Sequence, residues 1–124
     1  MLERLLDSVI LIDHFNGQPK AGRFLASLNP DSIAISVITL AELLVGFDPE
    51  TEEKARLLLN QFQVLPIESR IAEKAASLRL QYGWKLPDAF QAALALHHRL
   101  LLSTRNTKDF DPRKHPFVEI PYKL

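Results

Sequence analysis

The segment Leu86–Ala95, which reads LPDAFQAALA, carries the pattern that decides the fold. Proline followed by an acid is typical of a helix start, because the first turn does not use the N–H that proline lacks. A carboxylate there also suits the positive end of the helix dipole. The alanines that follow form a flat face that can lie close against a sheet. We therefore expect a helix packed on a sheet, with Asp88 at its amino end.

Short apolar segments alternate with helical patterns on both sides of this segment. We predict strands at Leu5–Leu6, Ile33–Ser36, Gln63–Ile67 and Leu100–Thr104, with a weaker fifth strand at Phe117–Ile120. Apolar periodicity predicts helices at residues 8–15, 19–28, 39–46, 49–62 and 68–82, besides the one that contains Asp88. This alternation predicts an α/β fold, an α/β/α sandwich in which a parallel sheet of four to five short strands is flanked by helices.

The composition limits the classes of function. The chain has 124 residues, 47% hydrophobic and 24% charged, which fits a single domain spanning residues 1–124. No apolar run is long enough to cross a bilayer, and no signal peptide is visible. The chain has no cysteine, so cysteine nucleophiles and thiolate metal sites are excluded, and we expect a cytoplasmic location. Basic and acidic residues balance at 15 each, so any polyanion must be bound by a local patch or through a metal.

Four acids fall where a parallel sheet binds its ligands, which is beyond the carboxyl ends of the strands: Asp7, Glu42, Asp88 and Asp109. Each also has a purely structural interpretation. Asp7 can cap the helix that follows it, and Thr39 with Glu42 matches a capping box. Asp88 suits a helix dipole, and Asp109 lies in a polar turn. Each structural interpretation is sufficient for its own residue. Taken together, however, they require that four unrelated acids lie at the same edge of the sheet by coincidence.

Several motifs around these acids occur in a particular order. They are Leu6-Asp7-Ser8, Ile12-Asp13, Thr39–Gly46, Leu86–Ala89 with Ala92-Ala93, and Thr104-Arg105-Asn106 with Asp109-Phe110. In this order they resemble the PIN-domain ribonucleases, and most closely the VapC-type toxins of bacterial toxin–antitoxin pairs. The resemblance extends from residue 5 to about residue 120.

The resemblance implies a metal-dependent endoribonuclease that hydrolyses RNA phosphodiester bonds. It assigns Asp7, Glu42, Asp88 and Asp109 as an acidic quartet that holds Mg²⁺ or Mn²⁺, with polar support from Ser8, Thr104 and Asn106. Two features depart from the family pattern. Val9 stands where the family usually has a small polar residue. Relatives also place the last acid at the position of Asn106 or at that of Asp109, and the sequence leaves this choice open.

Carboxylates are appropriate for this chemistry. Hard divalent ions prefer oxygen ligands, and they can lower the pKa of an attacking water and neutralise the charge that builds on the phosphate. Four carboxylates without a cation repel one another, which raises the pKa of at least one of them. No Gly-x-Ser-x-Gly motif supplies a competing serine nucleophile.

Basic residues and partners complete the interpretation. Arg105 and Lys108 border the predicted pocket and are candidate RNA-binding residues, while Asp13 is expected to support the site by bonding to backbone or to a basic residue. The resemblance further implies transfer or ribosomal RNA as substrate and an antitoxin that fills the acidic groove. It also implies a homodimer, for which helices 49–62 and 68–82 could supply the interface. The alternative is a catalytically weak PIN-like binding module that acts mainly in an autoregulatory complex with antitoxin and DNA.

Overall fold

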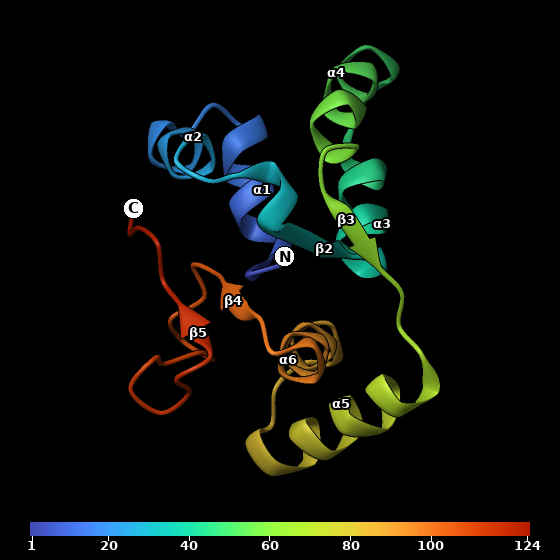
Figure 1. The fold of residues 1–124 in the computed structure, drawn as a ribbon, viewed down its shortest axis with the longest axis vertical. Helices are drawn as coiled ribbons and strands as arrows, with labels where there is room; N and C mark the ends of the chain where they lie inside the picture. Colours follow the sequence, from blue (N-terminus) through green and yellow to red (C-terminus); the bar gives the residue numbers. More distant parts are fainter.

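The computed structural model describes all 124 residues, which form a five-stranded parallel sheet in the order β3-β2-β1-β4-β5 (Figure 1). The strands are β1 (Arg4–Leu6), β2 (Ile33–Ser36), β3 (Gln63–Leu65), β4 (Leu101–Ser103) and β5 (Val118–Glu119). Every neighbouring pair is parallel. The predicted fold class is therefore confirmed, and so is the weak fifth strand.

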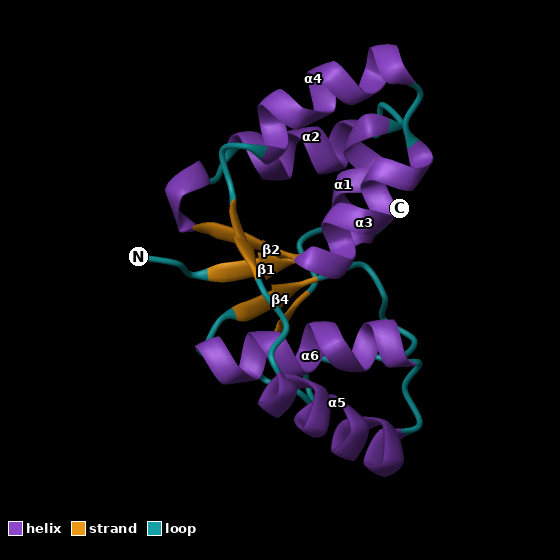
Figure 2. Ribbon diagram, turned by 90° about the vertical axis from the view of Figure 1, so that its right-hand side faces the viewer, coloured by secondary structure: helices purple, strands orange, loops and turns teal.

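Helices cover both faces of this sheet and make three layers (Figure 2). One layer contains α1 (Ser8–Phe15), α2 (Pro19–Ala26), α3 (Val37–Gly46) and α4 (Pro49–Leu59). The other contains α5 (Ser69–Tyr82) and α6 (Leu86–His98), and a short 3-10 turn (Pro30–Ser32) leads into β2. None of these helices is both long and apolar enough to cross a membrane.

The central strand β1 separates two apolar cores. Leu5 packs with α5, α6 and Leu102, whereas Leu6 packs with Leu11 of α1 and Leu43 of α3. Adjacent residues of a strand point to opposite faces of the sheet, so these two leucines anchor the two helical layers. Because β1 is apolar on both faces, it lies at the centre of the sheet.

Helix α6 lies against the sheet through the alanine-rich face that the sequence predicts. Ala89, Ala92, Ala93 and Ala95 are all fully buried. Helix α5 runs beside α6 and ends at Gly83, whose φ of 74° is the left-handed conformation that glycine adopts without a steric cost. These contacts place the amino end of α6, and with it Asp88, at the carboxyl edge of the sheet.

The predicted capping box in α3 is wrong. The helix begins at Val37, and Ser36 is its N-cap, whose Oγ accepts a hydrogen bond from the Thr39 backbone N–H at 3.0 Å. Thr39 is buried inside the helix, where its Oγ1 accepts a hydrogen bond from Gln91 Nε2 at 2.6 Å. Ser36 is the last residue of a strand, and its extended backbone suits an N-cap. Glu42 is therefore not needed to close the amino end of the helix.

Two other helices end earlier than predicted. Helix α2 stops at Ala26 rather than at residue 28, and α4 stops at Leu59 rather than at residue 62. Ser27 and Asn60 are their C-cap residues, and in each case a short turn leads on to the next element. The apolar residues that follow these two helices lie in turns but still pack against the core. The spacing of apolar residues in the sequence therefore resembles that of a longer helix.

Replacing Ser36 by alanine tests this cap. The substitution Ser36→Ala should lower the free energy of unfolding by about 1–2 kcal/mol, because it leaves a buried N–H of the first turn without its acceptor. Denaturant unfolding followed by circular dichroism measures the change. Ser27→Ala, in which an exposed hydroxyl is removed, should change it by less than about 0.5 kcal/mol. Equal stabilities of the two variants would show that Ser36 is not the cap.

Candidate active site

The register of β1 and β4 brings together two polar residues that follow these strands. Leu6 is paired with Ser103, so Asp7 and Thr104 emerge side by side at the carboxyl edge. Thr104 Oγ1 donates a hydrogen bond of 2.6 Å to Asp7 Oδ2, and Asp7 is only 7% exposed. Asp7 precedes α1 at the N-cap position, but its side chain makes no capping hydrogen bond. The structural interpretation of Asp7 as a helix cap is therefore wrong.

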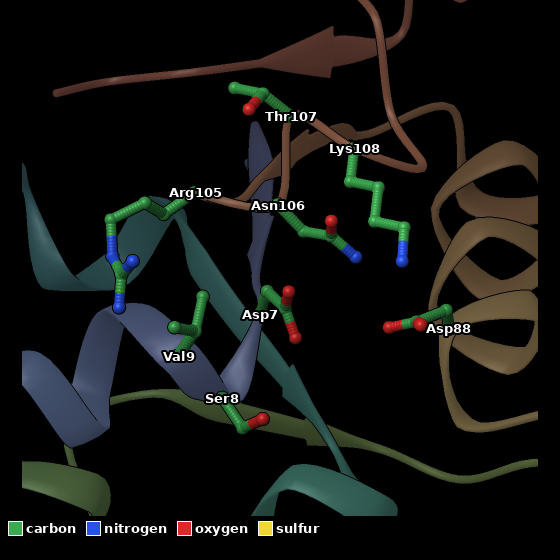
Figure 3. A pocket seen from close by; sticks show the side chains of 8 residues that line it. All are labelled: Asp7, Ser8, Val9, Asp88, Arg105, Asn106, Thr107 and Lys108. Atoms are coloured by element: carbon green, nitrogen blue, oxygen red, sulfur yellow. The ribbon is translucent and has the colours of Figure 1, made fainter. Parts of the chain in front are cut away.

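A cleft of about 450 Å³ opens beside Asp7 (Figure 3). Its lining comes from the start of α1, the start of α6 and the loop after β4: Asp7, Ser8, Val9, Asp88, Arg105, Asn106, Thr107 and Lys108. Asp7 and Asp88 approach this space from different elements, and Asn106 and Lys108 extend toward it from the loop. The edge of the sheet therefore holds a polar cleft with two acids in its wall.

Burial and mutual repulsion perturb these acids. The pKa of Asp88 is raised from its ordinary value of 3.8 to about 6, first by burial and then by the negative charges of Asp7 and Asp109, while Lys85 opposes the change. The pKa of Asp7 is also raised by burial, which its hydrogen bond from Thr104 only partly offsets. Both shifts disfavour the charged forms, as expected when carboxylates are gathered without a cation.

The other two predicted acids lie outside the lining of the cleft but within its electrostatic reach. Glu42 lies on an exposed part of α3, and partial burial together with the charge of Asp7 raises its pKa. Asp109 lies behind Asn106, whose Nδ2 donates to Asp109 Oδ2 at 3.0 Å. The sequence leaves open whether the last site position is that of Asn106 or that of Asp109. Asn106 lines the cleft and Asp109 does not, although the charge of Asp109 raises the pKa of Asp88.

The donors fit a hard divalent cation that is held by few protein ligands. No three histidine or acidic side chains lie close enough together to form a ready-made metal site. Mg²⁺, however, is commonly bound through one or two carboxylates, with water molecules completing its shell. Asp7 and Asp88 supply two carboxylates at one cleft, and Asn106 lines the same cleft.

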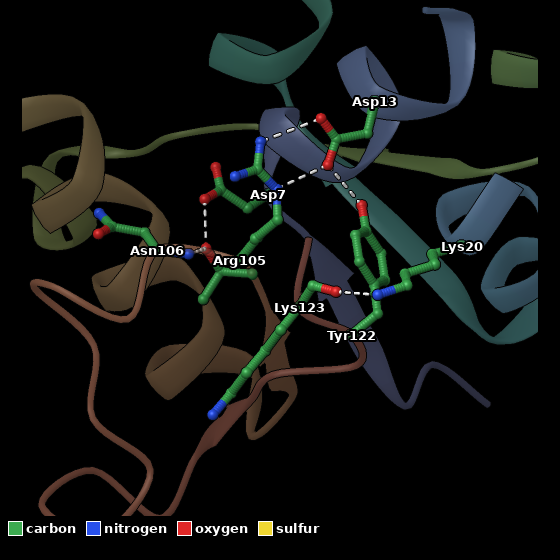
Figure 4. A network of polar contacts seen from close by, with 8 residues as sticks. Asp7, Asp13, Lys20, Arg105, Asn106, Tyr122 and Lys123 are labelled. Atoms are coloured by element: carbon green, nitrogen blue, oxygen red, sulfur yellow. Dashed lines mark hydrogen bonds and ion pairs between the residues drawn. The ribbon is translucent and has the colours of Figure 1, made fainter. Parts of the chain in front are cut away.

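A second polar network holds the loop that carries Arg105 (Figure 4). Arg105 donates to both oxygens of Asp13, through Nε at 2.7 Å and Nη2 at 3.0 Å, and the Tyr122 hydroxyl donates to Asp13 Oδ2 at 2.7 Å. Burial alone would raise the pKa of Asp13, but these hydrogen bonds and the charge of Arg105 lower it. The expectation that Asp13 binds a basic residue is confirmed. Tyr122 was missed by the sequence analysis.

The network also distinguishes the two candidate RNA-binding residues. The guanidinium of Arg105 is held by Asp13 in the wall of the cleft. Lys108 makes no ion pair, and its side chain is exposed at the rim. Lys108 is therefore the freer of the two cations for a phosphate.

Comparison with known proteins identifies the family of the chain. Residues 4–114 match the PIN domain family model. The chain is 34% identical over 123 residues to Ribonuclease VapC10 of Mycobacterium tuberculosis, and the alignment covers 92% of each chain. The chain belongs to the PIN-domain family, in its VapC branch.

Solved structures of other proteins are similar along nearly the whole chain. A toxin–antitoxin complex from Klebsiella pneumoniae contains a chain that is 42% identical, with a TM-score of 0.90 and coverage of 98% of this chain and 100% of that one. The DNA-bound VapBC of Salmonella typhimurium matches with a TM-score of 0.80 at 24% identity, covering 99% of this chain and 98% of that one, and supports the fold alone.

The raised pKa of Asp88 leads to a pH-dependent prediction for the metal-free protein. In EDTA, Asp88→Asn should raise the melting temperature at about pH 7.5, because it removes a carboxylate that the fold disfavours in its charged form. The native pKa lies above the unfolded one, so this penalty is complete above about pH 6 and disappears as the pH falls toward 3.8. The advantage of the variant should shrink across that interval.

Melting curves of the wild type and the variant across this pH range provide the measurement. Glu53→Gln, on the exposed surface of α4, is the matched control and should give no such trend. A pH-independent difference between Asp88→Asn and the wild type would contradict the assigned electrostatics.

Proposed function

We propose that the chain is a Mg²⁺- or Mn²⁺-dependent endoribonuclease that acts as the toxin of a toxin–antitoxin pair. The pairing of Asp7 with Asp88 across one cleft is the observation that carries this proposal. Membership of the PIN-domain family supports it, as do the ribonuclease name of the 34% identical relative and the toxin–antitoxin complex of the 42% identical structure.

The acids have distinct roles in the proposed reaction. Asp7 and Asp88 would hold the cation, and Glu42 and Asp109 would complete the acidic quartet through their charge at the same edge. When bound, a divalent ion would lower the pKa of the attacking water and neutralise the charge that develops on the phosphate. Because burial and repulsion disfavour the charged acids in its absence, cation binding relieves an existing electrostatic cost.

Polar and basic residues orient the acids and the substrate. Thr104 fixes the Asp7 carboxylate through its hydrogen bond, while Ser8 and Asn106 add polar groups to the cleft wall. Lys108 and Arg105 line the cleft from the loop after β4, where they would contact a phosphate of the RNA. Such contacts supply affinity for the RNA backbone, but they do not select a sequence.

The partners follow from the same proposal. An antitoxin segment with an arginine or lysine facing the carboxylates would neutralise the cleft and exclude RNA. Transfer or ribosomal RNA is the proposed substrate, in the cytoplasm. A homodimer through α4 and α5 is supported by Leu57 and Leu80, large apolar side chains that are 69% and 89% exposed on these helices.

Cleavage of RNA by matched variants tests the activity. Wild-type protein with Mg²⁺ or Mn²⁺ should cleave a mixture of transfer and ribosomal RNA, and EDTA should abolish cleavage. Asp88→Asn should lower the rate by about 100-fold or more, because it removes a ligand charge at the reacting phosphate. Gel analysis of end-labelled RNA provides the measurement.

Asp31→Asn is the control, since Asp31 is exposed at the opposite edge of the sheet, and it should retain full activity. Cleavage that survives both EDTA and Asp88→Asn would refute the metal-nuclease proposal. If neither form cleaves under varied metals and RNAs, a binding role with antitoxin and DNA becomes the better account.

Metal binding can be tested without any substrate. Saturating Mg²⁺ or Mn²⁺ should raise the melting temperature of the wild type at neutral pH, by about 3–6 °C for each kcal/mol of binding free energy. Asp88→Asn should lose most of this shift. The shift should also weaken below about pH 6, because protons then compete for Asp88. A melting temperature that does not respond to millimolar metal would count against an assembled site.

A further inference from the structure

A second hollow, of about 400 Å³, lies next to the acidic cleft and is not used by the proposed reaction. It is formed by the end of α5 and the loop after β4, and its lining is Tyr82, Trp84, Lys108, Asp109, Asp111, Lys114 and His115. Lys108 lines both the hollow and the cleft, so the two are adjacent. A chain bound in the cleft can therefore continue into this hollow.

The hollow contains an aromatic stack with one exposed member. The rings of Tyr82 and Trp84 lie 4.6 Å apart at 20°, and Trp84 also packs on Phe110 at 4.8 Å. His115 packs edge-on near both, at 5.0 Å from Tyr82 and 5.1 Å from Trp84. Trp84 is 4% exposed, whereas Tyr82 is 44% exposed. Tyr82 is thus a partly exposed aromatic ring supported by a buried one.

The stack is fixed relative to the acidic cleft. Trp84 Nε1 donates a hydrogen bond of 3.1 Å to the backbone oxygen of Asp109, in the loop that lines the cleft. Arg79 Nη1 donates to the backbone oxygen of Trp84 at 2.7 Å, which holds the turn after α5. Arg79 is therefore engaged in structure, while the ring of Tyr82 keeps a defined position beside the cleft.

The charges around the stack favour an anionic ligand. Lys108 and Lys114 are exposed and form no ion pair. Of the two acids in the lining, Asp111 pairs with Arg113 at 3.1 Å, whereas Asp109 accepts from the neutral amide of Asn106 at 3.0 Å and keeps its negative charge. Two lysines without ion-pair partners therefore flank the aromatic surface.

We propose that Tyr82 stacks on an unpaired base of the RNA strand next to the phosphate held in the acidic cleft, while Lys114 contacts the backbone beyond it. Single-stranded nucleic acid is bound in this way, by aromatic side chains that stack on bases inside a positively charged groove. The inference rests on the proposed ribonuclease function and deepens it, because it requires an unpaired nucleotide beside the cleaved bond.

The protein contains a natural reporter for this contact. Trp84 is the only tryptophan in the chain and lies directly against Tyr82. Titration in EDTA, which prevents cleavage, would use a uridine oligoribonucleotide and an abasic oligomer with the same number of phosphates. The uridine oligomer should change the fluorescence of Trp84 and bind more tightly. Equal affinity of the two oligomers would overturn the proposal, because binding would then require only phosphates.

Matched variants separate stacking from charge. Tyr82→Ala should weaken binding of the uridine oligomer by about 5- to 150-fold, whereas Tyr82→Phe, which retains the ring, should bind as the wild type does. Ser77→Ala, at another exposed position of α5, should have no effect. Lys114→Ala should weaken both oligomers and lower the slope of log affinity against log salt by about 1. Unchanged uridine affinity in Tyr82→Ala would overturn the proposal.

Cleavage assays distinguish the two proposals. If the wild type and Tyr82→Ala cleave RNA with the same kcat/KM, the stacking proposal is wrong and the nuclease function stands. If no protein cleaves RNA but Tyr82→Ala loses uridine affinity, the nuclease function fails and base stacking stands. If Tyr82→Ala instead retains full uridine affinity and loses only the binding of a protein partner, the surface binds a protein and the stacking proposal is wrong.

Discussion

The hydrogen bond from Thr104 to Asp7 joins residues that are 97 positions apart, and the geometry of the candidate site depends on it. It forms because β1 and β4 are neighbouring parallel strands in register, so the residue after each strand emerges at the same level. The bond orients a carboxylate that is almost completely buried. Without this partner, the charged form of Asp7 would lose the largest of the hydrogen bonds that offset its burial. The sheet therefore specifies the position of one acid, and α6 specifies the position of the other.

The acids do not stabilise the fold that holds them. Burial and repulsion raise the pKa values of Asp7 and Asp88, so their charged forms oppose folding at neutral pH. Stability comes instead from the two apolar cores on either side of β1, of which the acids are not members. Functional sites commonly contain groups with perturbed pKa values that do not stabilise the fold. The rest of the structure holds these charged groups close together, although they would otherwise move apart. The cation that removes the repulsion would stabilise the protein and complete the site together.

The parts of the fold that were predictable from sequence are those with local or repeated signals. The alanine face behind Asp88 predicts close packing on a sheet, and the alternation of strands and helices predicts its parallel direction. The start of α3 was not predicted, because Ser36 and Thr39 can both act as caps and only the end of β2 decides between them. Tyr122 was not predicted either, since its bond to Asp13 spans 109 positions and leaves no local pattern.

The same distinction explains the acidic site. The order of the motifs predicts that Asp7 and Asp88 belong to the site, and both residues line the cleft. Their positions have a local signal in the sequence, because Asp7 directly follows a strand and Asp88 lies in the first turn of a helix. The roles of Asn106 and Asp109 depend on how one loop turns, and the sequence leaves these open. The structure places Asn106 in the wall and Asp109 behind it, joined by a hydrogen bond. Although Asp109 does not line the cleft, its negative charge still raises the pKa of Asp88.

This loop is braced by both helical layers, which explains how a surface segment can form half of a defined cleft. Arg105 ties its beginning to Asp13 of α1, and Trp84, after α5, ties its end through the backbone of Asp109. The segment between these two anchors includes Asn106 and Lys108, so an amide and a free cation are presented to the acids from one side. In the proposed complex, an RNA strand at Asp7 and Asp88 would lie along this segment, and the hollow lined by Tyr82 is adjacent to it. The loop would then link the proposed chemistry at the acids to the proposed recognition of a neighbouring nucleotide.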